Sequence, residues 1–282
     1  NVHMGAARLT AKDTIEVTPK EGETETLKAR SIIIASGSHP FTVPGVELDG
    51  EKVIEFETAI LRDKLPDSAV IIGGGAIGVE FATIWSAYGV KLTIVEMLDS
   101  LLPLEDPEVG KEVQKAYKKR GIKVMTKSKV LGVEATKDGT KVTVQSEDGE
   151  ETINADLTLV AIGFRPNSAD LGLEDVGVEV SKRGYIEIDD RMATNVDGIY
   201  AIGDVTGKLL LAHVASAMGI VAAENIAGVE TVTLDYDMMP RATYSFPQTA
   251  SFGYTEAQAK EKGYDVVVGK FPFQPNGKAL GL

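Results

Sequence analysis

The pattern of apolar and polar positions divides the chain into three parts. In residues 1–66, short alternating runs predict antiparallel strands, and the unbroken apolar run 31–35 predicts a buried strand of parallel type. Residues 67–186 alternate between apolar runs and stretches of helical period, which predicts a doubly wound α/β domain with a parallel sheet. After residue 187 the pattern predicts one buried strand, an apolar helix and then short strands.

Each helix and strand is predicted from its period and from the glycines and prolines that flank it. Helices are expected at about 58–65, after the glycine turn at 73–78 up to about 88, and at about 107–119, 212–226 and 256–262. Strands are expected at 69–72, 91–96, 122–125, 157–162 and 198–204, with a three-stranded meander at 130–135, 141–145 and 151–154. Toward the end of the chain, strands are expected at 242–246, 250–253 and 266–271.

Composition narrows the classes of function. The net charge of −13 argues against a nucleic-acid or anionic-membrane partner, because such a surface repels phosphate. The chain has no cysteine, which excludes disulfides, thiolate metal sites and a cysteine nucleophile within it, and we expect no metal site. No apolar stretch approaches about 20 residues and no leader pattern is present, so we expect a cytoplasmic location.

The strongest chemical signal is the motif Gly73-x-Gly75-x-x-Gly78, which follows an apolar strand and opens a helix. The first glycine permits a tight turn, the second lets backbone approach a pyrophosphate, and the third lets helix and strand pack closely. Glu96 ends the next predicted strand, where a carboxylate accepts hydrogen bonds from a ribose diol and repels a 2′-phosphate. The motif predicts an NAD site, the alternative being a structural glycine turn with a solvated Glu96.

Several other residues fit either a site or a purely structural role. Ser36 and Gly37 form a turn after a strand, and Asp204 ends another strand beside a helix N-terminus, where a carboxylate can hold a sugar or ribityl hydroxyl. His213 opens an apolar helix, a position that is more often structural than catalytic. Glu80, near the start of the glycine-motif helix, is either a capping charge or a site residue.

Together these residues resemble a known family, the flavoprotein disulfide reductases or pyridine nucleotide–disulfide oxidoreductases. The resemblance extends over essentially the whole chain, and two segments are similar to the dihydrolipoamide dehydrogenase branch. The general motifs lie at 34–40, 70–80, 160–167 and 194–204, and the branch motifs at 211–219 and 246–256. The resemblance implies an NAD-binding domain at 67–186 inserted into a partial FAD-binding domain at 1–66 and 187–239. Residues 240–282 would begin an α+β dimerisation domain.

The resemblance also implies which residues hold the cofactors. The NAD site would comprise Gly73, Gly74, Gly75, Ala76, Ile77, Gly78, Glu80, Glu96, Val130 and Gly163. Of these, Glu96 would hold the adenosine ribose, Val130 the adenine edge and Gly163 the nicotinamide side. The FAD site would comprise Ser36, Gly37, Ser38, Asp204, Leu210, Leu211, Ala212 and His213, with Ala7 in a turn at 4–7 beside the adenine. Glu80 would in addition pair with a lysine near the flavin N5.

In the family, electrons pass from the dithiol of dihydrolipoamide through a redox disulfide and FAD to NAD+. The resemblance therefore implies a homodimer that works with the lipoyl domains of 2-oxoacid dehydrogenase complexes. The family's first glycine motif, its cysteine pair and its His–Glu dyad are not in this sequence. We therefore expect a fragment that binds NAD weakly and oxidises no dihydrolipoamide unaided. Ser216 and Met218 depart from the nearest branch, which keeps open a mercuric reductase, glutathione reductase or transhydrogenase type, or a non-catalytic nucleotide-binding module.

Overall fold

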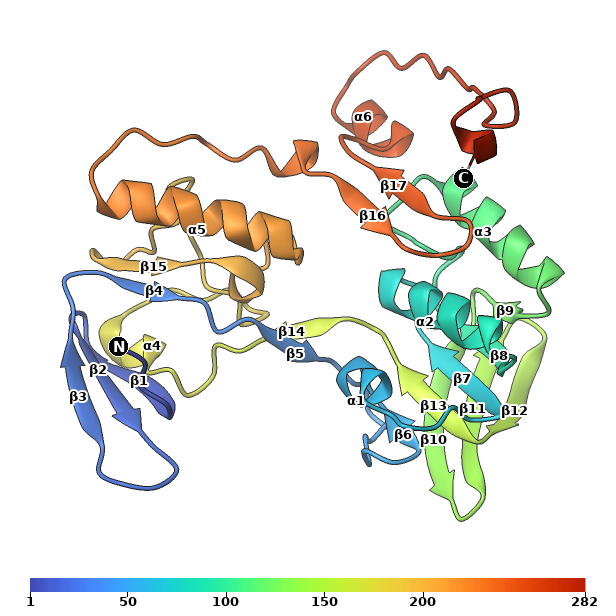
Figure 1. Ribbon diagram of the computed structural model, residues 1–282, viewed down its shortest axis with the longest axis horizontal. Coiled ribbons are helices and arrows are strands. Elements are labelled where there is room, and N and C mark those ends of the chain that lie inside the picture. The colour runs from blue at the N-terminus through green and yellow to red at the C-terminus, as the bar shows by residue number, and fades with distance from the viewer. Residues whose placement is uncertain (282) are drawn as a thin grey trace.

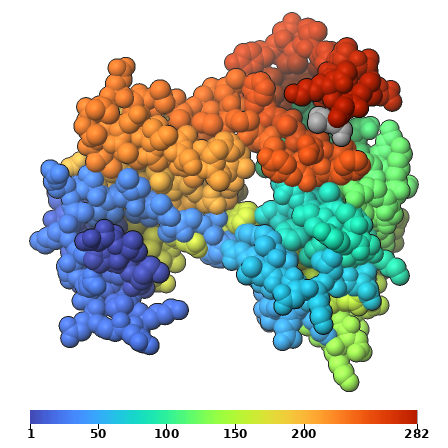
Figure 2. All heavy atoms as spheres, in the orientation of Figure 1, coloured from blue at the N-terminus to red at the C-terminus, as the bar shows by residue number. Residues whose placement is uncertain are grey.

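The chain folds into two lobes joined by a narrow ribbon (Figure 1). The structure is a computed structural model that describes residues 1–281. The ribbon pairs β5 (Ser38–Pro40) antiparallel with β14 (Phe164–Pro166). We call residues 41–163 the five-stranded lobe, residues 1–37 and 167–239 the two-stranded lobe, and residues 240–281 the tail. Figure 2 shows a deep notch between the two lobes on one side of the ribbon.

The five-stranded lobe is built on a parallel sheet with the strand order β6-β13-β7-β8-β9. These strands are β6 (Val53–Ile54), β13 (Leu157–Val160), β7 (Ser68–Ile72), β8 (Lys91–Val95) and β9 (Lys123–Met125). The helices are α1 (Phe56–Ile60), α2 (Ala76–Ala87) and α3 (Pro107–Lys119), and the meander is β10 (Lys129–Thr136), β11 (Gly139–Ser146) and β12 (Gly149–Ala155). Parallel neighbours need crossover connections, which α2 and α3 supply.

The central strand β7 shows why residues 69–72 are apolar at every position. Ala69 and Ile71 pack into the cluster that includes α2 and α3, whereas Val70 and Ile72 pack into the cluster that includes the meander. Alternate side chains of a strand point to opposite faces, so a strand covered on both faces is apolar throughout.

The two-stranded lobe has a smaller parallel sheet, in which β4 (Ile32–Ile34) pairs with β15 (Ile199–Ala201). Figure 1 shows α5 (Ala212–Ile226) lying along this sheet. The other elements of the lobe are β1 (Ala6–Ala11), β2 (Thr14–Thr18), β3 (Glu25–Lys28), α4 (Leu173–Val176), η1 (Gly203–Thr206) and η2 (Tyr236–Met238). Strands β1, β2 and β3 form an antiparallel sheet, and its Leu9 shares a core with Ile34, Ile186 and Ile199.

The tail lies against α2 and α3 of the five-stranded lobe (Figure 1). It contains the antiparallel hairpin of β16 (Arg241–Thr243) and β17 (Thr249–Ser251), then α6 (Glu256–Glu261) and η3 (Ala279–Gly281). Arg241 Nε lies 3.6 Å from Glu105 Oε1, and this ion pair is mostly buried at 24% and 12% side-chain exposure. The hairpin is thus held to the five-stranded lobe by a partly desolvated charge pair.

The predicted α/β class is confirmed, and the helices expected at 107–119 and 212–226 are observed at those bounds. Four local predictions were wrong. The helix expected at 58–65 is instead α1, which begins at Phe56, where Glu55 accepts from the backbone N–H of Glu57 and Thr58, and ends at Ile60. Residues 266–271 are not a strand, although their composition favours one. Residues 6 and 7 begin strand β1 rather than lying in a turn. The run 31–35 is not buried throughout, since Ile33 is 40% exposed.

The lobes do not follow the predicted domain bounds closely. Strand β6 lies before residue 67 yet pairs with β13 in the five-stranded sheet. Leu173, Val178 and Ile186 lie before residue 187 yet belong to the core of the two-stranded lobe. The division into an inserted domain and a surrounding one stays a prediction. In the structure, β6 joins the five-stranded lobe, and residues 173–186 pack with the two-stranded lobe.

Candidate functional site

The glycine turn between β7 and α2 has the close backbone contacts that the motif predicts. Gly73 has φ 107°, and a Cβ added there would lie 2.3 Å from the carbonyl oxygen of Ala161. A Cβ on Gly78 would lie 2.0 Å from the carbonyl oxygen of Gly73. Both positions therefore require glycine, because any side chain would collide with backbone.

The middle glycine differs because the space around it is open. A Cβ on Gly75 would meet no heavy atom within 4 Å, and Gly75 is the N-cap of α2 with no side-chain cap hydrogen bond. The first N–H groups of α2 thus have no side-chain cap at the positive end of the helix dipole. An open turn of this kind, at an uncapped helix N-terminus, fits a phosphate group.

Glu96 lies directly against this turn rather than in solvent. Its Oε2 accepts a hydrogen bond from Gly74 N at 2.6 Å, and its Oε1 accepts one from Leu98 N at 2.7 Å. The residue is only 7% exposed. A buried carboxylate requires such donors, and its charge disfavours a second anion beside it. The reading of Glu96 as a solvated surface charge is therefore wrong.

Two further predicted residues lie near the strands that form the turn. Val130 follows Ser128, whose N–H donates to the carbonyl oxygen of Glu96 at 2.9 Å, and Val130 packs into the meander-side core. Gly163 has φ 122° and open space around it, and it follows Ala161, the residue in contact with Gly73. Ala161, just before Gly163, contacts the turn directly, whereas Val130 lies in the same core cluster as Ile72, and the cofactor roles of Val130 and Gly163 stay predictions.

A second cluster lies at the ribbon end of the two-stranded lobe. Ser38 Oγ donates to Asp204 Oδ2 at 2.8 Å, and Ser36 Oγ donates to the carbonyl oxygen of Asn167 at 2.6 Å. Gly37 has φ 72° with no heavy atom within 4 Å of an added Cβ. The structure therefore brings together the predicted turn at 36–38 and the predicted carboxylate of Asp204.

Asn167 is the residue of this cluster that was not predicted as a site residue. Its N–H donates to Gly37 O at 3.0 Å, and its Nδ2 donates to Ser36 O at 2.9 Å. Its Oδ1 lies 2.6 Å from His39 Nδ1. The signal that could have identified it is the Pro-Asn pair directly after a buried strand and turn, which is typical of a side chain that bonds backbone.

The remaining residues expected on this side occupy different environments. Leu211 is the N-cap of α5 with no side-chain cap hydrogen bond, so this helix also begins with free N–H groups near Leu210 and Ala212. His213, in the first turn of α5, is exposed. Ala7 is exposed in β1 and pairs with Val17, so its placement in a turn was wrong.

Glu80 faces the tail. Its Oε1 accepts a hydrogen bond from Tyr244 N at 2.7 Å, and the residue is half-buried on α2. This contact was not predicted, because helix and hairpin are 164 residues apart in sequence. The expected ion pair of Glu80 with a lysine stays a prediction.

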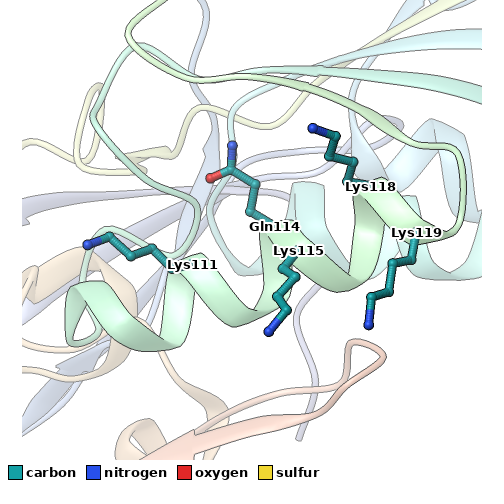
Figure 3. Close-up of a pocket in the computed structure, with 5 residues that line it drawn as sticks. All are labelled: Lys111, Gln114, Lys115, Lys118 and Lys119. Atoms are coloured by element: carbon teal, nitrogen blue, oxygen red, sulfur yellow. The ribbon is translucent and has the colours of Figure 1, made fainter.

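The side chains that line the hollow on the outer face of α3 do not form a binding site. It is an open depression of about 580 Å³ lined by Lys111, Gln114, Lys115, Lys118 and Lys119. Figure 3 shows Lys115 and Lys119 pointing to one side of the helix and Lys118 to the other, so their ammonium groups do not converge on one ligand. Within residues 1–281, no cluster of three or more His, Asp or Glu side chains is arranged to hold a metal ion, and no helix is long and apolar enough to cross a membrane.

Comparison with known proteins places this geometry in one family. The profile described as pyridine nucleotide-disulphide oxidoreductase matches residues 1–219, and the dimerisation domain of the same family matches residues 239–282. The chain is 52% identical over 274 residues to a dihydrolipoyl dehydrogenase of Corynebacterium glutamicum, covering 95% of this chain and 58% of that protein. It is 52% identical over 284 residues to one of Mycobacterium leprae, covering 99% of this chain and 60% of that protein.

Solved structures agree with the sequence comparison. LpdA from Mycobacterium tuberculosis superposes with a TM-score of 0.87 at 28% identity, covering 95% of this chain and 58% of that one. The HOCl-induced flavoprotein disulfide reductase RclA from Escherichia coli superposes with a TM-score of 0.82 at 27% identity, covering 94% of this chain and 60% of that one. The chain thus spans less than two thirds of the length of these relatives. It belongs to the pyridine nucleotide-disulphide oxidoreductase family.

Proposed function

We propose that this chain provides the NAD site, and part of the FAD site, of a dihydrolipoyl dehydrogenase type of oxidoreductase. The observation that carries the proposal is the buried carboxylate of Glu96 on the N–H of Gly74, beside the open N-terminus of α2. A carboxylate in this position accepts from the hydroxyls of an adenosine ribose and repels a ribose phosphate, so the site favours NAD over NADP.

The binding role of each element follows from its position. The pyrophosphate would lie over Gly75, where the space is open and the N–H groups of Ala76 and Ile77 are available. Val130 would bound the adenine, and Gly163 would leave room for the nicotinamide end. Residues 67–186 would form most of this domain, with β6 added to its sheet.

The cluster at the ribbon fits the ribityl and pyrophosphate part of FAD. Ser38 and Asp204 present a hydroxyl and a carboxylate that are already hydrogen-bonded to each other, and the free N–H groups at the start of α5 lie in the same lobe. When bound, FAD would supply the two-electron relay that the protein's own side chains lack. The chain's residues would bind and orient it, with Gly37 allowing close approach of backbone.

The reaction of the whole protein is part of the same proposal. Dihydrolipoamide would be the electron donor and NAD+ the acceptor, supported by the names of relatives that are 52% identical. Because the chain contains no cysteine, it has no thiol that can exchange with a dithiol, so it would not oxidise dihydrolipoamide by itself. The match of residues 239–282 to a dimerisation domain supports a homodimer. Lipoyl domains of 2-oxoacid dehydrogenase complexes would be partners of that dimer.

Calorimetric titration of the 282-residue chain tests the nucleotide site. We expect NADH to bind and NADPH to bind at least about tenfold more weakly, because the phosphate would meet the Glu96 carboxylate. The variant Glu96→Gln removes the charge and should reduce the difference in affinity between NADH and NADPH. The control Glu134→Gln changes an exposed glutamate on β10 and should leave that difference unchanged. Absence of any heat with NADH, in a chain shown to be folded by circular dichroism, would refute the proposal.

A further inference from the structure

A chain of hydrogen bonds connects the tail hairpin to the inside of helix α2. Phe246 N donates to Thr83 Oγ1 at 3.2 Å, and Thr83 Oγ1 lies 2.7 Å from the hydroxyl of Tyr117. Tyr117 in turn donates to the carbonyl oxygen of Val79 at 2.5 Å. The chain therefore starts on the tail, crosses α2 and α3, and ends on backbone in the first half of α2.

Counting protons fixes the direction of this chain. A backbone N–H can only donate, so Thr83 accepts from Phe246. Tyr117 has one hydroxyl proton and donates it to Val79 O, so its oxygen accepts the proton of Thr83. Every donor then has one acceptor, and bonds aligned in this way polarise one another. Tyr117 is fully buried, which raises the pKa of its hydroxyl to about 12 and keeps it protonated at physiological pH.

The same face of α2 makes a second, parallel contact with the tail. Glu80 accepts from Tyr244 N while Thr83 accepts from Phe246 N, so two side chains one turn apart on the helix accept from N–H groups of the loop that follows β16. Arg120, at the end of α3, places its guanidinium 5.4 Å from the Phe246 ring centroid. The hairpin is thus held through its backbone, and Phe246, although its ring is mostly exposed, adds a cation–π contact.

We propose that Thr83 and Tyr117 are positioning residues that dock the hairpin on α2, and that this docking is coupled to nucleotide binding at the N-terminus of the same helix. The coupling rests on the proposed NAD site. Glu80 links the two events, because it lies on α2 just after Gly78 and its carboxylate accepts from the docked tail. By linkage, a nucleotide that favours this arrangement of α2 tightens the hairpin, and the docked hairpin raises nucleotide affinity by the same factor.

Hydrogen exchange of the full chain tests the docking without any ligand. In Thr83→Val the amides of residues 244–251 should exchange about tenfold faster than in the wild type, since the acceptor of Phe246 N is lost. Thr83→Ser keeps the hydroxyl and should restore wild-type exchange, and Tyr117→Phe should give an intermediate rate. Thr140→Val is the matched control: it removes a buried threonine hydroxyl of the same lobe, bonded to Thr158 rather than to the tail.

Adding NADH tests the coupling. Saturating NADH should slow exchange of residues 244–251 in the wild type and in Thr140→Val but not in Thr83→Val, and the NADH Kd should rise about three- to tenfold in Thr83→Val alone. Equal tail exchange in Thr83→Val and Thr140→Val would overturn the docking role. Normal NADH binding with no change in tail exchange would overturn the coupling. Failure of the wild type to bind NADH would instead refute the proposed function, and the ligand-free exchange would still decide the docking role.

Discussion

The two lobes contain the same unit, a parallel strand followed by a turn and an apolar helix, yet they differ in how completely the strand is covered. In the five-stranded lobe, β7 has a strand on each side and packed layers on both faces, and Ile71 is fully buried. In the two-stranded lobe, β4 pairs with β15 alone among the described strands, and Ile33 is 40% exposed. The helix α5 likewise leaves Ile220 60% exposed.

This difference shows that the burial of a strand depends on the strands and helices packed around it and not on its own sequence alone. It also separates the two candidate sites by how they are supported. The glycine turn follows a strand in which residues 69–72 are all packed in the core, so its geometry is fixed by core packing. The turn at 36–38 is held instead by hydrogen bonds to Asn167 and Asp204. We expect core substitutions to damage the first site and loss of single hydrogen bonds to damage the second.

The largest expected effect separates the two strands directly. Ile71→Ala removes a fully buried side chain and should lower the free energy of unfolding by about 3–4 kcal/mol, whereas Ile33→Ala should cost about 0.5 kcal/mol. Urea denaturation followed by circular dichroism measures both. Similar losses for the two variants would show that β4 is covered as fully as β7 in solution, and the comparison between lobes would fail.

A smaller effect is expected from two glycines of one turn. Gly78→Ala forces a Cβ against the carbonyl oxygen of Gly73 and should cost about 2–3 kcal/mol of folding free energy. Gly75→Ala meets open space and should leave stability unchanged within about 0.5 kcal/mol, but it should weaken NADH binding by filling the phosphate position. Thermal unfolding and NADH titration of both variants separate a packing role from a binding role. A stable Gly78→Ala variant would contradict the packing role.

The five-stranded lobe was predictable from sequence because its periodicity and its contacts agree. The strand at Ser68–Ile72, the helix at Pro107–Lys119 and the meander are all local patterns with clear turn residues. The run 266–271 shows the limit: its residues favour a strand, but within the described chain it has no strand partner, and pairing is what makes a strand. The predicted burial of Ile33 was wrong for the same reason. The apolar run 31–35 does not show that a neighbouring element is missing on one face of the strand.

The candidate site was predictable where one motif carries it. Gly73, Gly78 and Glu96 lie in a single βαβ unit, so spacing along the chain fixes their meeting in space. Asn167 and Thr83 were not predicted as site residues, because their partners lie 131 and 163 residues away and are mostly backbone groups. A backbone partner has no side-chain signature, and single sequences do not show which N–H groups will need an acceptor.

An intermediate effect is expected where hydrogen bonds support the second site. Asn167→Ala removes the bond to Ser36 O and the contact with His39, and should cost about 1–2 kcal/mol while loosening residues 36–39. Asn195→Ala is the matched control, since this asparagine also bonds backbone twice in the same lobe, at Gly177 and Glu179. FAD titration and hydrogen exchange should show weaker binding and faster exchange at residues 36–39 for Asn167→Ala alone. If the two variants had equal effects on FAD binding and on exchange at residues 36–39, Asn167 would not be the residue that supports this turn.

The smallest expected effect is electrostatic and tests whether packing alone supports the five-stranded lobe. Partial burial would raise the pKa of Asp49, but hydrogen bonds from the N–H groups of Val53, Glu51 and Lys52 outweigh it and hold that pKa below 3.8. Because the pKa is lower in the folded state, the ionised carboxylate stabilises the fold at a pH above the unfolded-state pKa of about 3.8. This stabilisation is lost as the pH falls below that value toward the folded-state pKa. Asp49→Asn keeps the accepting oxygen and removes the charge.

Because Asp49 is exposed, the charge should contribute less than about 1 kcal/mol. Urea midpoints of the wild type and Asp49→Asn should therefore differ slightly at pH 7 and approach each other as the pH falls below 3.8, whereas Asp148→Asn, in the β11–β12 turn, should show no such convergence. A difference that stays unchanged as the pH falls below 3.8 would mean that the shape of the Asp49 side chain matters there and not its charge. Asp49 leads into β6, the two-residue edge strand of the sheet. Convergence would thus show that even the well-packed lobe relies on single polar contacts at its edge, as the two-stranded lobe does around Asn167.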